Sequence, residues 1–565
     1  MRAKQPLKNE LWNDCKRGWR ACNLGVESVG RPTGSLVAFE PGLPIGRGNE
    51  PATRNEMEAN NSKVRRLREV ADVVATLRAG GKKVIHCHGV FDLLHIGHIK
   101  HLEAARKLGD VLVVTITPDR FVNKGPHRPA FPERLRAEAL ASLACVDWVA
   151  INEWPTAVET IRTLKPNLYV KGVVRESGKR DHTDAIQQEE NAIKSVGGDL
   201  VLTDEETFSA SALINRFMEV FTPETKAFLE RFRSQHTPEE ITGYLQAIRK
   251  LKVLIVGEAI IDEYQFCSVL GKSGKESILA ALHNRTEQYV GGVLAIANHV
   301  SNFCDQVAVL TSLGEVNSCE DFIRSELNDN VVPCFVRMPE RPTIIKRRFL
   351  QEYPGAKLFE VYVMRDEGLP NEVEEEFCRL LEARLPQFDV VIVADYGHGL
   401  LRSRARQLVC EGSKFLAVNT QTNAGNRGFY TISKYSRSDY VSIGEMEVRL
   451  DARQLDADLE VLVGNLAEKI HTRKLLATQG SFGCLIHDRK QGMQRVPAFS
   501  IRVVDRVGAG DAVLGVTAPC AALDVPPAVL GFIANVVGAE ACTIMGNRSF
   551  IEPSSLFRHI SSLLK

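Results

Sequence analysis

Short apolar runs alternate with amphipathic stretches along most of this chain. From Lys83 to about Phe217, the runs VIHCH, DVLVVTI, VDWVAI, NLYVK and DLVL predict strands, and stretches such as PERLRAEALASLA predict helices. A second array begins at LKVLIVGEAIID and continues to the C-terminus through QVAVLTSLG, DVVIVAD, FLAVN, DYVSI and KLLATQG. Such alternation is typical of parallel sheets with helices on both faces. The pattern therefore predicts the α/β class, with two Rossmann-like three-layer α/β/α domains.

The chain length and local composition indicate where the domains begin and end. A chain of 565 residues is too long for a single core. A helical pattern runs from about Ser62 to Leu77, and a later helix opens with Thr237 as cap and Pro238 at its first position. The expected segments are an irregular, Gly-, Pro- and Asn-rich extension at 1–60, a first domain at 61–221, a helical connector at 222–250 and a second domain at 251–565.

Composition narrows the class of protein further. Lys and Arg number 71 against 70 Asp and Glu, so no net charge indicates nucleic acid as a partner. The thirteen cysteines form no CxxC pair, and no apolar run reaches the ~18 residues of a membrane helix. We therefore expect a soluble cytoplasmic protein with reduced thiols, without zinc, haem or flavin, and without nucleic-acid or membrane partners.

The stretch VIHCHGVFDLLHIGHIKH, from Val84 to His101, predicts a strand, a tight turn at Gly89 and a helix beginning near Gly97. His95 and His98 stand at the entrance of that helix. Free N–H groups of a first helical turn and the positive end of the helix dipole attract anions, and two imidazoles add further donors. A nucleotide phosphate is the expected occupant.

The run HIGH preceded by GVFDLLH resembles the signature of the HxGH nucleotidylyltransferase (cytidylyltransferase-like) superfamily. The resemblance implies transfer of a nucleotidyl group to a phosphate acceptor, with release of pyrophosphate. It implies catalytic roles for His95, His98 and Lys124. It implies nucleotide contacts from Gly89, Phe91, Asp92, Arg128, Arg136, Lys171, Gly172, Ser209 and Ser211. ATP is the expected nucleotide and CTP the alternative, and FSASALI departs from the longer Ser-Thr-rich run of the superfamily.

The second chemistry-bearing segment is DRVGAGD, from Asp505 to Asp511. Its glycines let the backbone approach an anion closely, and the helix that starts there directs its N–H groups at the same place. Asp511 stands beside that anion site as a carboxylate. A carboxylate so placed can take the proton of a hydroxyl that attacks a γ-phosphate.

DRVGAGD resembles the DTxGAGD signature of ribokinase-like sugar kinases, which implies that Asp511 is the catalytic base. The resemblance implies nucleotide contacts from Thr478, Gly480, Gly483, Gly508, Ala509, Gly510 and Asn535. It implies sugar contacts from Asp262, Gly291, Gly292, Asn298, Asp395 and Lys346, and a role in Mg²⁺ binding for Glu445. Glu258, Ala295 and His398 depart from the family pattern on the sugar side.

Two β-rich segments, from Tyr264 to Tyr289 and from Arg341 to Tyr362, resemble the small β lid of this family, where Lys346 or Arg348 would meet a sugar phosphate. Lid strands often pair between subunits in the family, so the resemblance implies a homodimer. The two halves together resemble the bifunctional heptose 7-phosphate kinase and heptose 1-phosphate adenylyltransferase family, in reversed domain order. That implies MgATP and sugar phosphates as substrates. The alternatives are CTP with a different sugar or polyol phosphate, or a degenerate kinase half that serves as a nucleotide-binding regulatory or scaffold module.

Overall fold

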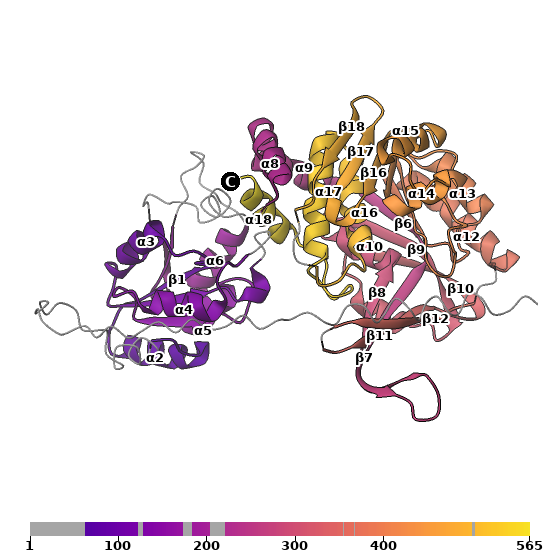
Figure 1. Ribbon diagram of the computed structural model, residues 1–565. Helices are drawn as coiled ribbons and strands as arrows, with labels where there is room; N and C mark the ends of the chain where they lie inside the picture. Colours follow the sequence, from indigo (N-terminus) through magenta and orange to yellow (C-terminus); the bar gives the residue numbers. More distant parts are fainter. Residues whose placement is uncertain are drawn as a thin grey trace, which may run out of the picture. The chain divides into compact units, whose positions relative to one another are not determined.

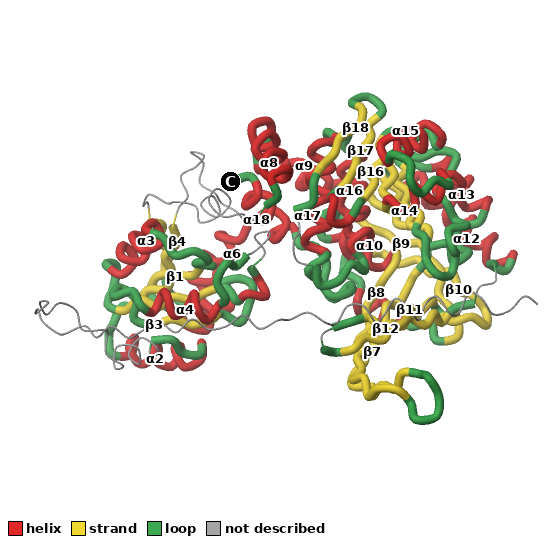
Figure 2. Tube along the Cα trace, in the orientation of Figure 1, coloured by secondary structure: helices red, strands yellow, loops and turns green. Residues whose placement is uncertain are grey.

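The computed structural model contains two α/β bodies, each built around its own sheet (Figure 1). The sheet of the first body is parallel, and that of the second is parallel except for antiparallel pairing of its last strands, Cys484–Asp488 and Gly492–Val496. The residues that the structure describes are 63–122, 128–172, 184–203, 221–353, 355–365, 368–499 and 503–565. The expected irregular extension at 1–60 therefore lies outside the described residues. Figure 2 shows strands enclosed by helices in each body, so the predicted α/β class and the two three-layer domains are confirmed.

The first body has a five-stranded sheet in the order β3-β2-β1-β4-β5. Its strand pairs are all parallel. The strands are β1 (Val84–Gly89), β2 (Val111–Ile116), β3 (Trp148–Ile151), β4 (Leu168–Gly172) and β5 (Asp199–Thr203). The helices are α2 (Leu67–Ala79), α3 (Ile96–Arg106), α4 (Glu133–Ala141), α5 (Val158–Leu164) and α6 (Asp184–Ser195). The strand order reverses between β1 and β4, which is where a doubly wound sheet binds its ligand.

The helix predicted from Ser62 begins later than expected, at Leu67. The preceding residues extend the sheet instead, because Val64 forms a parallel bridge to Val149 and the Arg65 N–H donates to the Val149 carbonyl. Backbone pairing with a strand edge therefore replaces the first helical turn. The helix ends at the Gly pair that the sequence indicated, with Gly80 as its C-cap.

The second body has a nine-stranded sheet in the order β10-β9-β6-β13-β14-β15-β16-β17-β18. The strands are β6 (Lys252–Gly257), β9 (Gln306–Val316), β10 (Val331–Pro342), β13 (Val390–Asp395), β14 (Leu416–Thr420), β15 (Tyr440–Gly444), β16 (Lys474–Thr478), β17 (Cys484–Asp488) and β18 (Gly492–Val496). The helices are α10 (Val293–Ser301), α11 (Glu320–Glu326), α12 (Asn371–Arg384), α13 (Ser403–Gly412), α14 (Glu445–Ala452), α15 (Leu459–Lys469), α16 (Ala509–Ala522), α17 (Pro527–Ala541) and α18 (Pro553–Leu563). Here the order reverses between β6 and β13.

The expected β lid is a separate four-stranded sheet in the order β12-β11-β7-β8. Its strands are β7 (Ala259–Lys272), β8 (Leu279–Gly292), β11 (Ile344–Gln351) and β12 (Lys357–Val363). Figure 2 shows the far end of the β7–β8 hairpin projecting beyond the rest of this sheet. The near ends of β7 and β8 adjoin β6 and α10, so the lid is continuous with the strand and helix that border the switch point.

The expected connector is helical, as α8 (Pro223–Gln235) and α9 (Pro238–Ala247). Thr237 caps α9 as predicted, because its hydroxyl accepts a hydrogen bond from the Glu240 N–H at 3.2 Å. Both helices bury their apolar faces in the core of the second body, where the Phe232 ring stacks on Phe532 at 4.5 Å between centroids. These helices therefore form part of the second body.

Candidate active sites

His95 and His98 lie together at the N-terminus of α3, above the carboxyl end of β1. His95 is the N-cap of α3, and its Nδ1 accepts a hydrogen bond from the Gly97 N–H at 3.2 Å. The two imidazole rings stack with 3.8 Å between centroids, and the Phe91 ring meets His98 edge-on at 5.2 Å. The expected cluster of imidazoles at a helix entrance is therefore present.

The hydrogen bond to His95 also fixes where its proton lies. An Nδ1 that accepts from a backbone N–H is unprotonated, so the neutral ring carries its proton on Nε2. Burial lowers the pKa of His95, which favours this neutral form. The Nε2 atom is buried and has no hydrogen-bond partner among the described residues. It is therefore a donor suited to a phosphate oxygen.

Asp92 connects the turn after β1 to the loop before α4. Its side chain is 3% exposed and accepts hydrogen bonds from the Ala130 N–H and from Arg128 Nη1, the latter at 3.5 Å. Burial lowers the pKa of Arg128, and the Asp92 carboxylate partly offsets that effect. The structure thus brings Asp92 and Arg128 together beside the HIGH helix, where the sequence resemblance expected both.

Arg136 was expected to contact the nucleotide, but its guanidinium is occupied by protein acceptors. It is 2% exposed and donates to the carbonyls of Phe131, Val90 and Thr117. It also forms an ion pair with Asp119 at 2.6 Å. These partners come from the turn after β1, the end of β2 and the start of α4, so Arg136 holds the loops of the site together.

Lys171 and Gly172 end β4, across the switch point from Gly89. The Lys171 ammonium forms an ion pair with Glu189 of α6. A Cβ on Gly172 would approach His101 Nδ1 at 3.6 Å, and this Nδ1 is bonded to Thr203 Oγ1 at 2.7 Å. His101 lies on α3, six residues after the N-cap His95, so both belong to the helix that borders the switch point.

Sequence reasoning missed His88, which lies at the end of β1. Its Nδ1 is bonded to Thr115 Oγ1 at 2.8 Å and its Nε2 to Thr117 Oγ1 at 3.2 Å. Burial and the nearby Lys171 charge lower the pKa of His88 to about 3, so the ring stays neutral. Its alternation with His86 in VIHCHG was the available signal. Lys124, Ser209 and Ser211 lie outside the described residues, and their roles stay predictions.

Asp511 lies in the first turn of α16, whose N-cap is Gly508 with a φ of +80°. The Tyr396 hydroxyl donates to Asp511 Oδ1 at 2.7 Å. The pKa of Asp511 is raised to about 7, mainly by burial and also by the nearby Asp262. The hydrogen bond from Tyr396 and the charge of Lys346 lower it. A Cβ on Gly510 would meet nothing within 4 Å, so the start of α16 borders open space as an anion site requires.

Asp262 occupies the start of the lid and is 4% exposed. It forms an ion pair with Arg348 of β11 and accepts from Asn547 Nδ2 at 3.1 Å. A Cβ on Gly291 would lie 2.2 Å from Asp262 Oδ2, and Gly292 has a φ of +56°. Gly291 is therefore required because the lid carboxylate passes directly against its backbone, and Gly292 because of its positive φ.

Lys346 is 5% exposed, and its Nζ lies 5.3 Å and 5.6 Å from the ring centres of Tyr362 and Tyr396. The pKa of Lys346 is lowered, mainly by burial and also by the nearby Arg348 charge. The carboxylates of Asp262 and Asp511 act in the opposite direction and raise it. The lysine expected to meet the sugar is therefore placed among the acids of the site.

Asp395 and Asn298 were expected to contact the sugar, and in the structure their side chains bond to protein groups. Asp395 accepts from the Gly397 N–H at 3.0 Å and the Tyr435 hydroxyl at 2.7 Å, and pairs with Lys434 at 2.9 Å. Asn298 is fully buried. Its Nδ2 donates to the Glu326 carbonyl at 2.8 Å, and its Oδ1 accepts from the Asn328 N–H at 2.9 Å. The structure gives Asn298 the role of holding the segment after α11, because both ends of its amide are bonded there.

The residues expected to contact the nucleotide in the kinase body lie on segments next to β16, α14 and α17. Gly480 and Gly483 have φ values of +57° and +94°, which favour glycine. Thr478 Oγ1 donates to the Ile443 carbonyl at 3.4 Å, and Asn535 Nδ2 donates to the Val496 carbonyl at 3.1 Å. Ala509, between the two glycines of the GAGD run, is the first residue of α16.

Glu445 begins α14, where it was expected to serve Mg²⁺. Burial alone would raise its pKa, but hydrogen bonds from Arg449 and Gln479 outweigh burial and lower it. Among the residues that the structure describes, no group of three or more His, Cys, Asp or Glu side chains is arranged to hold a metal ion.

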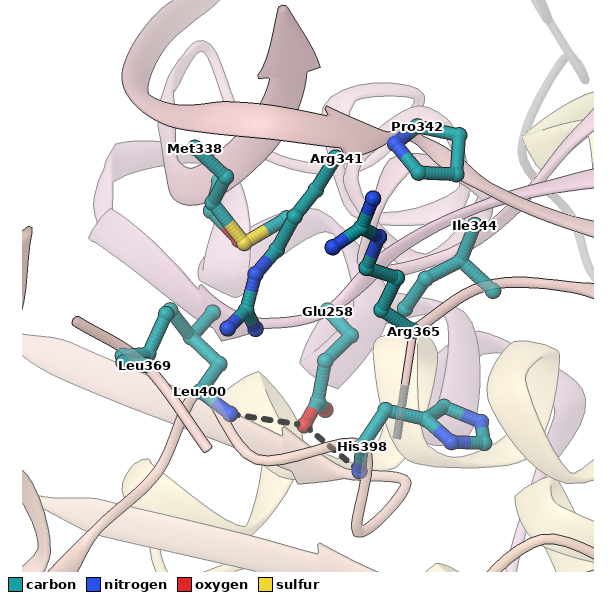
Figure 3. Close-up of a pocket in the computed structure, with 10 residues that line it drawn as sticks. Glu258, Met338, Arg341, Pro342, Ile344, Arg365, Leu369, His398 and Leu400 are labelled. Carbon is teal, nitrogen blue, oxygen red and sulfur yellow. Dashed lines mark hydrogen bonds between the residues drawn. The ribbon is translucent and has the colours of Figure 1, made fainter. Parts of the chain in front are cut away.

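A pocket lies where the lid meets the β6–β13 switch point (Figure 3). Figure 3 shows the Arg341 side chain running down beside Glu258, and the Arg365 guanidinium directed toward Pro342 and away from the Glu258 carboxylate. Glu258 accepts hydrogen bonds from the N–H groups of Tyr396, His398 and Leu400, at 3.0, 3.1 and 3.4 Å. The remaining lining residues are Ser312, Met338, Pro342, Ile344, Leu369, His398 and Leu400. No local sequence signal marks Arg341 and Arg365 as a pair, because they lie on different segments.

Comparison with known families accounts for both bodies. The model of the pfkB family carbohydrate kinases matches residues 250–553, more than half of the 565 residues. The chain belongs to the pfkB family of carbohydrate kinases. The cytidylyltransferase-like model matches residues 86–216. The expected combination of a nucleotidyltransferase body followed by a carbohydrate kinase body is therefore confirmed at the level of families.

The curated relatives resemble only part of this chain. The bifunctional protein HldE of Syntrophotalea carbinolica is 39% identical over 146 residues, which cover 26% of this chain and 28% of the relative. The bifunctional protein HldE of Trichlorobacter lovleyi is 35% identical over 172 residues, which cover 30% of this chain and 34% of the relative. The chain thus spans about a third or less of the length of these relatives.

Similar solved structures include two kinases. Escherichia coli phosphofructokinase-2 in complex with potassium has a TM-score of 0.46 and 13% identity, covering 56% of this chain and 100% of that chain. Ribokinase from Thermotoga maritima has a TM-score of 0.43 and 14% identity, covering 56% of this chain and 99% of that chain. Among the described residues, no helix has the length and apolar character needed to cross a membrane.

Proposed function

We propose that this chain is a cytoplasmic bifunctional enzyme that makes a nucleotide sugar. The kinase body would phosphorylate a sugar phosphate with ATP, and the transferase body would join a nucleotidyl group to a sugar 1-phosphate with release of pyrophosphate. The observation that carries the proposal is that each body places its reactive side chains at a helix N-terminus beside its switch point. Those side chains are His95 and His98 in one body and Asp511 in the other.

In the kinase reaction, Asp511 would take the proton of the acceptor hydroxyl while that oxygen attacks the γ-phosphorus and ADP leaves. The free N–H groups at the start of α16 would hold the phosphate oxygens as charge develops on them. Lys346 adds positive charge within the same site. The raised pKa of Asp511 suits a base that must capture a proton near neutral pH.

The acceptor would itself carry a phosphate, bound in the pocket beside Glu258. Arg341 and Arg365 both line that pocket, and Arg341 Nη2 donates to the Gly368 carbonyl at 2.9 Å. Guanidinium groups bind phosphate through paired hydrogen bonds. Asp262 and the Gly291–Gly292 backbone would contact the sugar between that pocket and Asp511. The proposed acceptor is therefore a sugar phosphate rather than a free sugar, with the heptose 7-phosphate of the sequence resemblance as the first candidate.

In the transferase reaction, an oxygen of the sugar 1-phosphate would attack the α-phosphorus of the nucleoside triphosphate. This attack brings two anions together, so the site must supply hydrogen-bond donors and positive charge rather than a base. The Nε2–H of His95, the ring of His98 and the N–H groups of α3 would contact the phosphates. Lys124, Arg128 and Lys171 would add charge, and Ser209 and Ser211 would meet the leaving pyrophosphate.

Mg²⁺ would accompany the nucleotide in both reactions. In the kinase body Glu445 is a single carboxylate whose oxygens accept hydrogen bonds from Arg449 and Gln479. One carboxylate suits Mg²⁺, which keeps several waters and is held largely by substrate phosphates. Glu445 therefore fits a contact to the ion through water, and the ion's contribution when bound is to neutralise phosphate charge.

The lid would also form the proposed homodimer. Four apolar side chains near the end of the β7–β8 hairpin are more than half exposed: Leu270, Ile278, Leu279 and Leu282. An isolated hairpin is marginally stable in water, so a second lid is the proposed cover. Sedimentation equilibrium of the wild type and of Leu282→Glu would test this, and a wild type that is monomeric at all concentrations would exclude the homodimer.

The kinase proposal is tested by sugar-phosphate-dependent formation of ADP. Asp511→Asn removes the base and should reduce kcat by at least about 100-fold, whereas the exposed Asp456→Asn serves as a matched control with wild-type activity. A wild type without activity on any sugar phosphate would leave the regulatory or scaffold alternative. An Asp511→Asn variant with full activity would remove Asp511 from the reaction.

The transferase proposal is tested by pyrophosphate release with sugar 1-phosphates and each nucleoside triphosphate. His98→Asn should lower kcat by roughly 100-fold to 1,000-fold, the usual effect of removing one charge-stabilising donor. The exposed His471, in the kinase body, gives a matched His471→Asn control that should be unchanged. Activity with CTP alone would refute the adenylyl assignment.

A further inference from the structure

Tyr396 is hydrogen-bonded both to Glu258, which lines the pocket, and to Asp511. Its hydroxyl donates to Asp511 Oδ1 at 2.7 Å, and its N–H donates to Glu258 Oε2 at 3.0 Å. Its carbonyl accepts from Asn423 Nδ2 at 2.7 Å and from Asn426 Nδ2 at 2.9 Å. The tyrosine is 2% exposed. Its backbone is therefore held by three hydrogen bonds while its hydroxyl is directed at the base.

We propose that Tyr396 is a positioning residue that fixes the orientation of the Asp511 carboxylate and stabilises its ionised form. The tyrosine donor occupies Oδ1, and Oδ2 has no hydrogen-bond donor among the described residues. Oδ2 is therefore the oxygen that would receive the proton of the acceptor hydroxyl. This inference rests on the proposed kinase function, and nothing in the DYGHG segment of the sequence identifies the tyrosine as a partner of the base.

The donor is needed because the other groups around Asp511 act in opposite directions. Asp262 of the lid raises the pKa of Asp511, as burial does, and Lys346 of β11 lowers it. Lys346 faces several groups at once, since Asp262, Arg348 and Glu258 all act on its charge and it also faces His398. Its positive charge is therefore shared among three acids. Tyr396 is the direct hydrogen-bond donor to Asp511 in the part of the chain that the structure describes.

Removing the hydroxyl has a defined expected effect. Hydrogen bonds to charged groups are worth enough to shift a pKa by about one to two units. In Tyr396→Phe, the pKa of Asp511 should therefore rise from about 7 toward 8 or 9. The acidic limb of the kcat profile should move to higher pH by the same amount. At pH 7 the rate should fall about 5-fold to 50-fold, because the ionised fraction of Asp511 falls by that factor, and most of the loss should be recovered above pH 9.

The experiment compares wild type, Tyr396→Phe and Tyr362→Phe as full chains. Tyr362 is the matched control, because its ring also faces Lys346 but the Tyr396 hydroxyl makes the bond to Asp511. Sugar-phosphate-dependent ADP formation is measured from pH 5.5 to 9.5. In parallel, the protein is labelled with ¹³C at aspartate carboxyls, and the Asp511 resonance is assigned as the one missing in Asp511→Asn.

A shifted acidic limb and a shifted Asp511 titration in Tyr396→Phe alone support the proposal. A rate that is reduced equally at every pH, or an Asp511 carboxyl that titrates as in the wild type, overturns it. If the wild type phosphorylates no sugar phosphate, the proposed function fails. The carboxyl titration still decides whether Tyr396 stabilises ionised Asp511, so the two failures are distinguishable.

Discussion

Two neighbouring arginines on β11 allow a sharp test of how the lid is stabilised. Arg348 pairs with Asp262, and the side chains are only 7% and 6% exposed. Arg347 pairs with Glu263, and here the arginine side chain is 35% exposed while that of Glu263 is 6% exposed. The perturbation is Arg348→Met, with Arg347→Met as the matched control, because both remove one guanidinium from the same strand.

The expected magnitudes differ because the carboxylates left behind differ. Without Arg348, the buried Asp262 keeps one direct donor, Asn547, at 3.1 Å. Removing one partner of a buried pair typically costs about 3–5 kcal/mol. Without Arg347, Glu263 keeps donors from two glutamines, Gln265 and Gln288. Since Arg347 is partly exposed, its loss should cost about 1 kcal/mol or less.

Differential scanning calorimetry of the full chain is the assay, with the kinase transition identified as the one that Gly508→Ala lowers. At roughly 2 °C per kcal/mol for a large domain, Arg348→Met should lower Tm by about 6–10 °C and Arg347→Met by about 2 °C or less. Equal shifts for the two variants would refute the reasoning, since they would mean that burial of the pair does not decide its contribution. An Arg348→Met variant whose Tm lies within about 1 °C of the wild-type Tm would refute it as well.

Four further predictions concern Asp511, the glycines at the start of α16 and Arg136. Because burial raises the pKa of Asp511 to about 7 and a base must be ionised, kcat of the kinase should rise with pH through neutrality; a flat profile from pH 6 to 8 would contradict this. The pKa of Asp511 is about 7 in the folded protein and 3.8 for the free side chain. The folded state therefore favours the protonated carboxyl, so the contribution of Asp511 to stability is present at low pH and is lost as pH rises through 7. Gly508→Ala should destabilise the kinase body, because Gly508 has a φ of +80° and an added Cβ would lie 2.1 Å from Asn547 Oδ1. Gly510→Ala should instead raise KM for ATP and leave Tm unchanged. Thermal scans and ATP titrations of the two variants separate these effects. Arg136→Met should lower the free energy of unfolding of the transferase body by about 3 kcal/mol or more, because it leaves several buried carbonyls without donors. The control Arg134→Met removes an exposed arginine and should change it by less than about 0.5 kcal/mol. Urea unfolding measures both variants, and similar values for the two would contradict the role of the buried Arg136 network.

The sequence predicted the features that depend on local chemistry. The glycine turns, the helix entrance at His95 and the position of Asp511 follow from neighbouring residues, and each is where the pattern placed it. The roles of Arg136 and Asn298 could not be predicted in this way. Their partners, among them Thr117 and Glu326, come from other elements, so only the packed structure determines which acceptors each side chain meets.

Glu258 illustrates how a departure from a family pattern acts through packing. In the sequence it stands where the family has an aspartate, which suggested a change in sugar contact. In the structure its carboxylate accepts from three N–H groups of the turn Asp395–Leu400, and burial together with the nearby Asp395 raises its pKa. One of these N–H groups belongs to Tyr396, whose hydroxyl reaches Asp511. The longer glutamate side chain therefore fixes the backbone turn from which the Tyr396 hydroxyl reaches Asp511, and this connection needs no contact between Glu258 and a sugar.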